Sequence, residues 1–208
     1  MDRLLIVGAG GHGCVVAETA IRSGLWSDVF HLDDLLERPQ LDVGTRVLGS
    51  ISDLTTLGTA NDQFVFGVGD NASRLRLFED LKNRMRAASV IASESLVSQT
   101  VSVADGCVIM PGVVVNAAVV LGQACVLNTS CIIEHGVKLD SAVHVGPGAI
   151  LGGDVEVGTR SFIGMGAKVL PGVSLGQDVI LGAGAVAVSD LYEPGAYVGV
   201  PAKPIMAH

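Results

Sequence analysis

The chain has 208 residues, of which 27 are glycine, and only 4% are aromatic. So few large rings do not suit an ordinary globular core, whereas a narrow core of small and branched side chains needs none. The formal net charge of −8 argues against a polyanion-binding surface, so we expect no nucleic-acid partner. Local cations or backbone N–H groups can still hold the phosphates of a small ligand.

Three features of the sequence bear on its compartment. Met1-Asp2-Arg3 runs directly into a strand-like segment, so we expect no signal peptide. The uncharged stretch 106–133 contains polar residues in a regular, non-helical period, so we expect no membrane span. The four cysteines form no CxxC pair, which favours a reduced, cytoplasmic protein.

The first half of the chain alternates between strand and helix patterns. Leu4–Val7 is a buried-strand run, and the helical pattern after it has an apolar face of Val16, Ala17, Ala20 and Ile21. We expect further strands at 26–32 and 64–68, the latter followed by a helix through Arg86. This order predicts an α/β domain with a small parallel sheet and Rossmann-like connections over residues 1–90.

Glycine-rich or acidic segments follow each of these predicted strands. They are Gly8-Ala9-Gly10-Gly11-His12-Gly13, Asp33-Asp34 and Gly69-Asp70-Asn71. The first satisfies GxGxxG, with an acidic residue some twenty positions later, which alone would suggest a dinucleotide. A sheet of about ninety residues is short for a whole NAD site. The glycines can also serve close packing of strand and helix alone. We favour a nucleotide or nucleotide-sugar phosphate at the helix N-terminus.

The second half carries a six-residue repeat. Every sixth residue from Val97 to Leu181 is Val, Ile or Leu, fifteen in succession. A second register, four residues on, holds small or β-branched residues and includes Cys107, Cys125 and Cys131. A solenoid with six-residue sides has this period. Three sides make a coil of about eighteen residues in which i and i+18 stack about 4.8 Å apart. We therefore expect the three cysteines to be core residues rather than nucleophiles.

This repeat resembles that of the hexapeptide-repeat acyltransferases, which form left-handed parallel β-helices and usually act as trimers. The segment Tyr197-Val198-Gly199-Val200-Pro201-Ala202-Lys203 is similar to the ending of that superfamily. The resemblance implies an all-β left-handed β-helix with a C-terminal tail over residues 91–208. It also implies a homotrimer with active sites shared between subunits.

The combination of G-x-G-G-H, then D-D, then G-D-N, ahead of this coil resembles the PglD/NeuD-like group over the whole chain. This group contains nucleotide-amino-sugar N-acetyltransferases of bacterial glycan synthesis and sialic acid O-acetyltransferases. The resemblance implies acetyl-CoA as co-substrate and a nucleotide-linked sugar as acceptor. The residues implied to bind that sugar are Gly10, Gly11 and His12 at the phosphates, Asp33 and Asp34 at the base and ribose, and Gly69 and Asn71 from the third strand's end.

Acetyl transfer to an amine needs a group that accepts the amine proton, and histidine suits this near neutral pH. Of the five histidines, we set aside His31, inside a predicted strand, and the terminal His208. The stretch 128–135 resembles the active-site segment of the group, which implies that His135 is the general base. The residues implied to lie along acetyl-CoA are Asn128, His144, Met165, Ala183 and Lys203, with Lys168 as a further candidate at its phosphates.

One position departs from the family pattern. Members commonly have Asp or Glu directly after the base, where the carboxylate orients the imidazole, and here that residue is Gly136. Glu134 adjoins His135 but should point to the opposite side of the strand. Asp154 is eighteen residues after Gly136, so it should stack one coil away. We predict that Asp154 orients His135.

The sequence leaves other functions open. An N-acetyltransferase acting on a UDP-linked 4-amino-4,6-dideoxy sugar or a similar compound comes first, and an O-acetyltransferase of sialic acid or another sugar is the alternative. A metal-dependent hydrolyase on the same coil would need three coil histidines, and only two are present, so we expect no metal. A non-catalytic scaffold is the remaining alternative. An outward aliphatic surface of Val114, Val120 and Ile132 indicates burial against another subunit.

Overall fold

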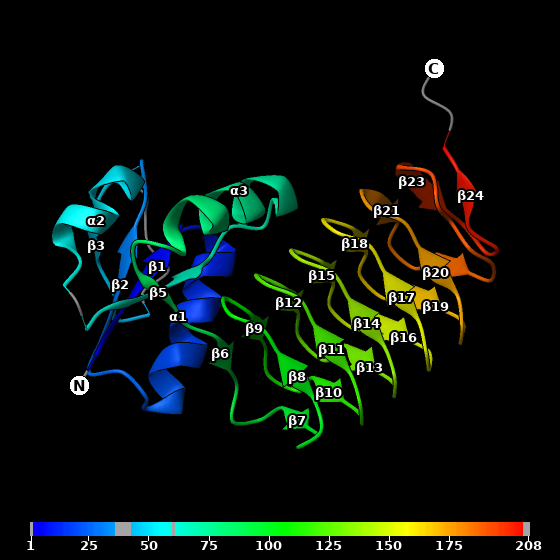
Figure 1. Ribbon diagram of the computed structural model, residues 1–208, viewed down its shortest axis with the longest axis horizontal. Helices are drawn as coiled ribbons and strands as arrows, with labels where there is room; N and C mark the ends of the chain where they lie inside the picture. The colour runs from blue at the N-terminus through cyan, green and yellow to red at the C-terminus, as the bar shows by residue number, and fades with distance from the viewer. Residues whose placement is uncertain (1, 36–42, 60, 206–208) are drawn as a thin grey trace.

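A computed structural model describes residues 2–35, 43–59 and 61–205 of the chain. A small α/β domain lies at one end of a long coil, and the chain runs from this domain along the coil to its far end (Figure 1). Met1 and His208 lie outside the described residues.

The N-terminal domain contains a five-stranded parallel sheet of order β3-β2-β1-β4-β5. Its strands are β1 (Arg3–Val7), β2 (Asp28–Leu32), β3 (Val47–Gly49), β4 (Gln63–Phe66) and β5 (Arg86–Ala87). Helix α1 (Gly11–Ser23) joins β1 to β2, η1 (Ile51–Asp53) and α2 (Leu54–Leu57) precede β4, and α3 (Asn71–Leu81) joins β4 to β5. Chain order reverses between β1 and β4, which confirms the Rossmann-like connection. Ligands bind open sheets of this kind outside the carboxyl ends of such strands.

Helix α3 is shorter than the sequence predicts. It ends at Leu81, the last residue of its buried face, and the chain then turns. Arg86, expected to be helical, instead opens β5 and pairs with Gln63 of β4. The helix-forming residues after Leu81 therefore yield to strand pairing, because tertiary contacts override weak local propensity.

The rest of the chain is a triangular parallel coil, in which strands eighteen residues apart pair in register, as Val114 does with Ile132. The six-stranded face contains β7 (Leu96–Val97), β10 (Val114–Val115), β13 (Ile132–Ile133), β16 (Ile150–Leu151), β19 (Lys168–Val169) and β22 (Val186–Ala187). The five-stranded face contains β8 (Ser102–Val103), β11 (Val120–Leu121), β14 (Lys138–Leu139), β17 (Glu156–Val157) and β20 (Ser174–Leu175). The eight-stranded face contains β6 (Val90–Ile91), β9 (Val108–Ile109), β12 (Val126–Leu127), β15 (His144–Val145), β18 (Phe162–Ile163), β21 (Val179–Leu181), β23 (Gly195–Val198) and β24 (Lys203–Pro204).

The two sequence registers form the interior of this coil. From Ile109 to Leu181, every residue of the first register is at most 3% exposed. Cys107, Cys125 and Cys131 of the second register are fully buried free thiols. Burial raises the pKa of Cys131 to about 12. The interpretation of these cysteines as core residues is therefore confirmed.

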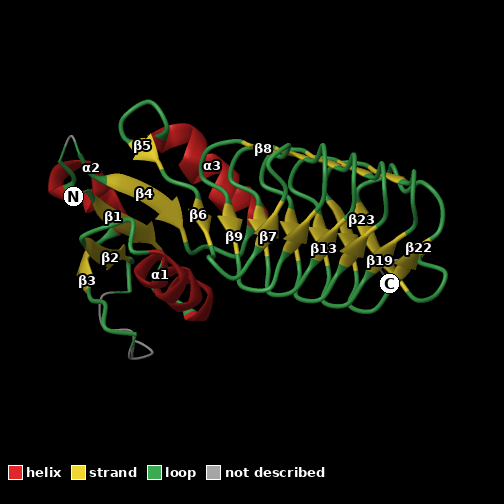
Figure 2. Ribbon diagram, turned by 90° about the horizontal axis from the view of Figure 1, so that it is seen from below, coloured by secondary structure: helices red, strands yellow, loops and turns green. Residues whose placement is uncertain are grey.

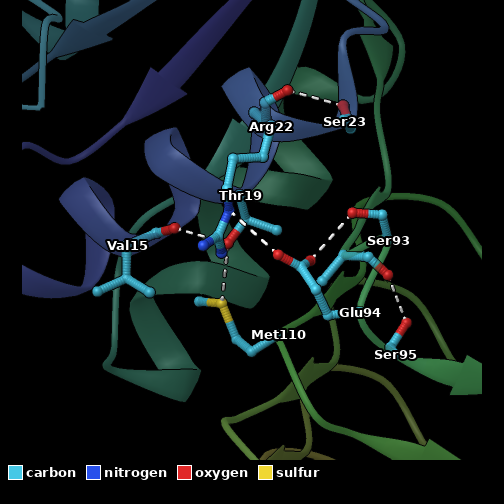
Figure 3. Close-up of polar contacts among 10 residues, drawn as sticks. Val15, Thr19, Arg22, Ser23, Ser93, Glu94, Ser95 and Met110 are labelled. Carbon is cyan, nitrogen blue, oxygen red and sulfur yellow. Dashed lines mark hydrogen bonds and ion pairs between the residues drawn. The ribbon is translucent and has the colours of Figure 1, made fainter.

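The α/β domain packs onto the first coils of the eight-stranded face. Figure 2 shows α1 and α3 on opposite sides of the sheet, both beside the first strands of the coil. On α1, the Thr19 hydroxyl lies 3.8 Å from the sulfur of Met110, and Arg22 forms an ion pair of 3.5 Å with Glu94 (Figure 3). These contacts hold the C-terminal half of α1 against the coil.

No helix among the described residues is both long and apolar enough to cross a membrane.

Candidate active site

The N-terminus of α1 opens onto the carboxyl edge of the sheet. Its N-cap, Gly10, has an extended backbone and makes no side-chain cap, and the first turn carries no acidic residue. The first N–H groups of α1 therefore suit a phosphate. A Cβ at Gly11 would meet nothing within 4 Å, so a ligand can approach this backbone closely.

Other glycines of this region serve packing instead. A Cβ on Gly67 would lie 2.5 Å from the Cα of Gly13, and a Cβ on Gly13 would lie 2.2 Å from the carbonyl oxygen of Gly8. Strand β1, helix α1 and the end of β4 thus meet backbone to backbone. Gly69, like Gly11, faces open space. The packing interpretation therefore holds for Gly8, Gly13 and Gly67, whereas Gly11 and Gly69 leave room for a ligand.

Asp33 and Asp34 directly follow β2 on the same edge of the sheet, and they differ in their contacts. Asp33 is buried, and its carboxylate accepts hydrogen bonds from the N–H groups of Ala9 (2.8 Å) and Leu35 (2.9 Å). It thereby holds the turn after β1 in place. Asp34 is exposed and accepts a hydrogen bond of 3.0 Å from the N–H of Ile51.

The side chains of His12 and His144 meet where α1 reaches the coil. Their ring centroids are 6.0 Å apart, and the rings are stacked at 29°. The ring of Phe162 packs edge-on against His144 at 5.1 Å. Asn128 approaches the same imidazole, with Nδ2 3.1 Å from Nε2 of His144. Although His144 points out of the coil, as its register predicts, the N-terminal domain covers it and leaves it 8% exposed.

This environment keeps both histidines neutral. Burial, and then the charge of Arg74, lower the pKa of His12 to about 4. Burial, Arg74 and His12 lower the pKa of His144 to about 3, with the backbone of Gly69 opposing them. The Oδ1 atom of Asn128 accepts the N–H of Thr129, so its Nδ2 donates to Nε2 of His144. The proton of neutral His144 is therefore on Nδ1, a buried atom without a hydrogen bond of normal geometry.

Arg74 of α3 connects the domain to the coil, and the sequence analysis did not single it out. Its side chain is 1% exposed and donates to the carbonyl oxygens of Ala124 (2.8 Å) and Ala142 (2.9 Å), both on coil corners. It also donates to the Oδ1 atom of Asn71 and to carbonyl groups at the end of β4. Burial lowers its pKa to about 10, so it stays charged at neutral pH. The sequence did carry one signal for the burial of Arg74, because this residue falls on the same helix face as Phe78 and Leu81.

Asn71 belongs to the same connection. Its Nδ2 donates to the carbonyl oxygens of Arg160 (2.8 Å) and Ser161 (3.1 Å), while its Oδ1 accepts from Arg74. These contacts bring Gly69 and Asn71 to the rim of a groove of about 410 Å³ between α3 and the coil. The residues lining it are Gly69, Asp70, Asn71, Ala72, Arg160, Phe162, Asp178 and Ile180.

Asn128, Met165 and Ala183 lie along one edge of the coil, where the eight-stranded face turns into the six-stranded face. Successive turns stack here, since the N–H of Gly184 donates to the carbonyl oxygen of Met165 at 2.9 Å. Met165 is 63% exposed, and Lys203 lies exposed on β24 beyond the last coil. We call this line of residues the Asn128 edge.

His135 and Asp154 lie on another edge, where the six-stranded face turns into the five-stranded face. Both side chains are largely exposed, and the Nδ1 atom of His135 is 4.0 Å from Oδ2 of Asp154. Glu134 accepts a hydrogen bond of 2.9 Å from Asn116. We call this line the His135 edge.

The structure therefore brings some of the predicted residues together and separates others. The sugar-binding candidate His12 meets the cofactor-binding candidates His144 and Asn128, while His135 and Asp154 lie across the width of the six-stranded face. Within residues 2–35, 43–59 and 61–205, no three His, Cys, Asp or Glu side chains are grouped as metal ligands.

Comparison with known proteins gives two kinds of match. The family model of the PglD N-terminal domain matches residues 3–81. The acetyltransferase domain of PglB from Neisseria gonorrhoeae is 33% identical with a TM-score of 0.95, and the match covers 99% of this chain and 100% of that one. PerB from Caulobacter crescentus, solved in complex with CoA and GDP-perosamine, is 33% identical with a TM-score of 0.93, over 99% of this chain and 98% of that one.

A further structure, WeeI from Acinetobacter baumannii, is 20% identical over 99% of this chain and 100% of its own, with a TM-score of 0.89, and shows the shared fold. The matches at 33% identity extend over both the Rossmann-like domain and the left-handed β-helix. The chain is an acetyltransferase and belongs to the PglD/NeuD-like sugar N-acetyltransferase family.

Proposed function

We propose that the protein transfers the acetyl group of acetyl-CoA to the amino group of a nucleotide-linked 4-amino-4,6-dideoxy sugar, UDP-linked or similar, for bacterial glycan synthesis. The contact between His12 and His144 carries this proposal. His12 belongs to the first turn of α1, which suits a phosphate, and His144 adjoins the Asn128 edge of the coil. A nucleotide sugar whose phosphates bind at the N-terminus of α1 could therefore extend its sugar to acetyl-CoA on the adjoining Asn128 edge.

The relatives support both substrates. PerB holds CoA and GDP-perosamine, and the PglB domain has been solved with acetyl-coenzyme A. We assign the α1 N-terminus and Asp34 to the nucleotide sugar, and the Asn128 edge with Lys203 to acetyl-CoA. Asp33 supports the nucleotide-sugar site indirectly, because its carboxylate holds the turn between β1 and α1 through the N–H of Ala9. We place the reaction in the cytoplasm, where the four free thiols stay reduced.

His135 is the general base of the proposed reaction. Its imidazole takes a proton from the sugar amine as the amine nitrogen attacks the thioester carbonyl carbon. The C–N bond forms, the C–S bond breaks, and the protonated imidazole returns the proton to the leaving CoA sulfur. Asp154 faces Nδ1 of His135, which leaves Nε2 for the amine. Their separation of 4.0 Å is too long for a hydrogen bond, but catalytic hydrogen bonds often tighten only in the substrate complex.

The reaction requires a homotrimer, because one chain separates the His135 edge from the Asn128 edge. These edges bound the six-stranded face, whose outward residues are mainly aliphatic: Leu96, Val114, Ile132, Ile150, Lys168 and Val186. If three such faces pack around a threefold axis, the His135 edge of one subunit meets the Asn128 edge of the next. Val114 and Ile132 belong to this surface, whereas Val120 lies on the five-stranded face beside Lys138 and is not part of it.

The test is incubation with acetyl-CoA and a panel of UDP- and GDP-linked 4-amino sugars, with free sialic acid as the competing acceptor. Free thiol release and the mass of each acceptor are followed. We expect thiol release that depends on a nucleotide-linked amino sugar, and a product that survives mild alkali, as an amide does and an acetyl ester does not. Release only with sialic acid would instead establish an O-acetyltransferase. No acceptor-dependent release would contradict the proposal.

A further inference from the structure

Four residues from two successive coils form the corner that carries the proposed base. His135 and Gly136 follow β13, while Gly153 and Asp154 follow β16, one coil further along. The N–H of Asp154 donates to the carbonyl oxygen of His135 at 2.9 Å, so the two dipeptides are stacked directly. Each dipeptide contains one glycine, and the two glycines lie diagonally across this corner.

Gly153 lies beneath the imidazole of His135. A Cβ on Gly153 would lie 2.6 Å from Cε1, 2.7 Å from Nε2 and 3.2 Å from Nδ1 of that ring, and these are the three nearest atoms. Gly153 is not among the residues with positive φ, so its backbone does not demand glycine. A side chain at residue 153 would therefore push the His135 ring out of its present place.

Gly136 has the same relation to the carboxylate of Asp154. A Cβ on Gly136 would lie 2.1 Å from Oδ1 and 3.2 Å from Cγ of Asp154. Gly136 has a φ of 69°, but Ala118 and Asp154 carry side chains at φ values of 60° and 58° in the equivalent turns of neighbouring coils. This turn therefore accepts a side chain at that position, and a side chain at residue 136 would push the Asp154 carboxylate out of its present place.

We propose that Gly136 and Gly153 are positioning residues that hold the imidazole of His135 and the carboxylate of Asp154 against each other. The ring leans over Gly153 toward the next coil, and the carboxylate leans back over Gly136, so Nδ1 and Oδ2 face one another. Because Gly136 has no side chain, the carboxylate of Asp154 from the next coil can occupy the space beside it. The inference rests on the proposed role of His135 as base.

Kinetics of three alanine variants test the positioning role. Gly153→Ala forces the exposed His135 ring aside, and a shift of about 1 Å in a catalytic group costs on the order of 100-fold in rate. We expect kcat to fall between about 10- and 100-fold for Gly153→Ala and for Gly136→Ala, with KM for both substrates within about twofold. Gly172→Ala is the matched control, since Gly172 occupies the next equivalent turn with a φ of 74° and open space around it. Its kcat should stay within about twofold.

An exchange of residues tests the shared space. Asp154→Gly removes the carboxylate, and Gly136→Asp crowds two carboxylates together, so each single variant should lose activity. The double variant Gly136→Asp/Asp154→Gly again has one carboxylate and one glycine at these two stacked positions, and we expect it to recover at least about tenfold over Asp154→Gly. Losses that simply add in the double variant would contradict the shared space.

A readout without turnover separates this inference from the proposed function. In ¹⁵N-histidine-labelled protein, neutral His135 should carry its proton on Nδ1, facing Asp154, and Gly153→Ala or Asp154→Asn should shift it toward Nε2. If no acceptor is ever acetylated, this tautomer shift still supports the positioning role. An unchanged tautomer in both variants would overturn it, as would a Gly153→Ala enzyme with unchanged kcat.

Discussion

The imidazole of His12 stacks on that of His144, with 6.0 Å between the ring centroids. His12 belongs to the first turn of α1 and His144 to the coil, so this contact crosses the boundary between the two domains. Neither ring carries a charge at neutral pH, because burial and the nearby Arg74 disfavour the imidazolium. The junction of the two proposed substrate sites thus contains two neutral imidazoles and one buried cation.

The first prediction concerns stability at acid pH. In the unfolded chain both histidines titrate near pH 6.5, whereas the pKa in the folded protein is about 4 for His12 and about 3 for His144. Below pH 6.5 the unfolded state therefore binds more protons, and the free energy of unfolding falls as the pH falls toward 4 and 3. Between pH 7 and pH 5 we expect a loss on the order of 3 kcal/mol from the two residues, measured by urea unfolding.

Substitution of His12 or His144 distinguishes their contributions to the pH dependence of stability from those of other titrating groups. His12→Gln and His144→Gln each remove one buried imidazole, so each should flatten the dependence of unfolding free energy on pH. His31, whose pKa burial also lowers, keeps its contribution in both variants. A dependence as steep in both variants as in the parent protein would contradict this assignment.

The second prediction concerns Arg74. Arg74→Met leaves buried carbonyl oxygens of Ala124 and Ala142 without a donor, and we expect a loss of about 2–4 kcal/mol in unfolding free energy. Because the charge of Arg74 also lowers the pKa values of His12 and His144, both should rise in this variant, as measured by NMR titration. Arg76→Met, at an exposed position of the same helix, is the control and should change neither. Unaltered stability in Arg74→Met would contradict the role of this contact.

The coil could be predicted from the sequence because its core repeats: one aliphatic residue in six is enough to fix the eighteen-residue stacking of residues such as Val114 and Ile132. The α/β domain could be predicted in outline, with the length of α3 wrong because strand pairing at Arg86 is not local. The contact of His12 with His144 could not be predicted, since the two residues are 132 positions apart in the sequence and the contact depends on how the domain packs on the coil. Arg74 was missed for the same reason, because its acceptors are backbone carbonyls that carry no sequence signal.

The third prediction concerns the base. His135→Ala should lower kcat by about 10²–10⁴-fold, the usual contribution of a general base, with little change in KM for acetyl-CoA. The melting temperature should stay unchanged, because the side chain is 64% exposed. Steady-state kinetics and a thermal melt on the same sample provide both measurements. A variant with kcat near that of the parent enzyme would exclude His135 as base.

The fourth prediction concerns the acetyl-CoA end of the coil. Lys203 and Lys168 are exposed, and each can pair with a phosphate of CoA. Lys203→Ala and Lys168→Ala should each raise KM for acetyl-CoA several-fold, leaving kcat within about twofold, since the phosphates lie far from the thioester. Raised ionic strength should reduce the difference between variant and parent. A fall in kcat with constant KM would assign these lysines a different role.

The fifth prediction tests whether the site is shared between subunits. In the proposed trimer, His135→Ala and Asn128→Ala should each inactivate every site. In mixed trimers, a site is intact when its His135 edge comes from the Asn128→Ala chain and its Asn128 edge from the His135→Ala chain, and random mixing makes about a quarter of the sites intact. Co-expression of the two variants under separate tags should therefore restore about a quarter of the parent activity.

The control experiment for the shared site co-expresses His135→Ala with Asp154→Asn. Both residues lie on one edge of the same chain, so no mixed site is complete and activity should not recover. No recovery in either mixture would place the reaction within a single chain, and equal recovery in both would contradict a site that takes His135 and Asp154 from the same edge.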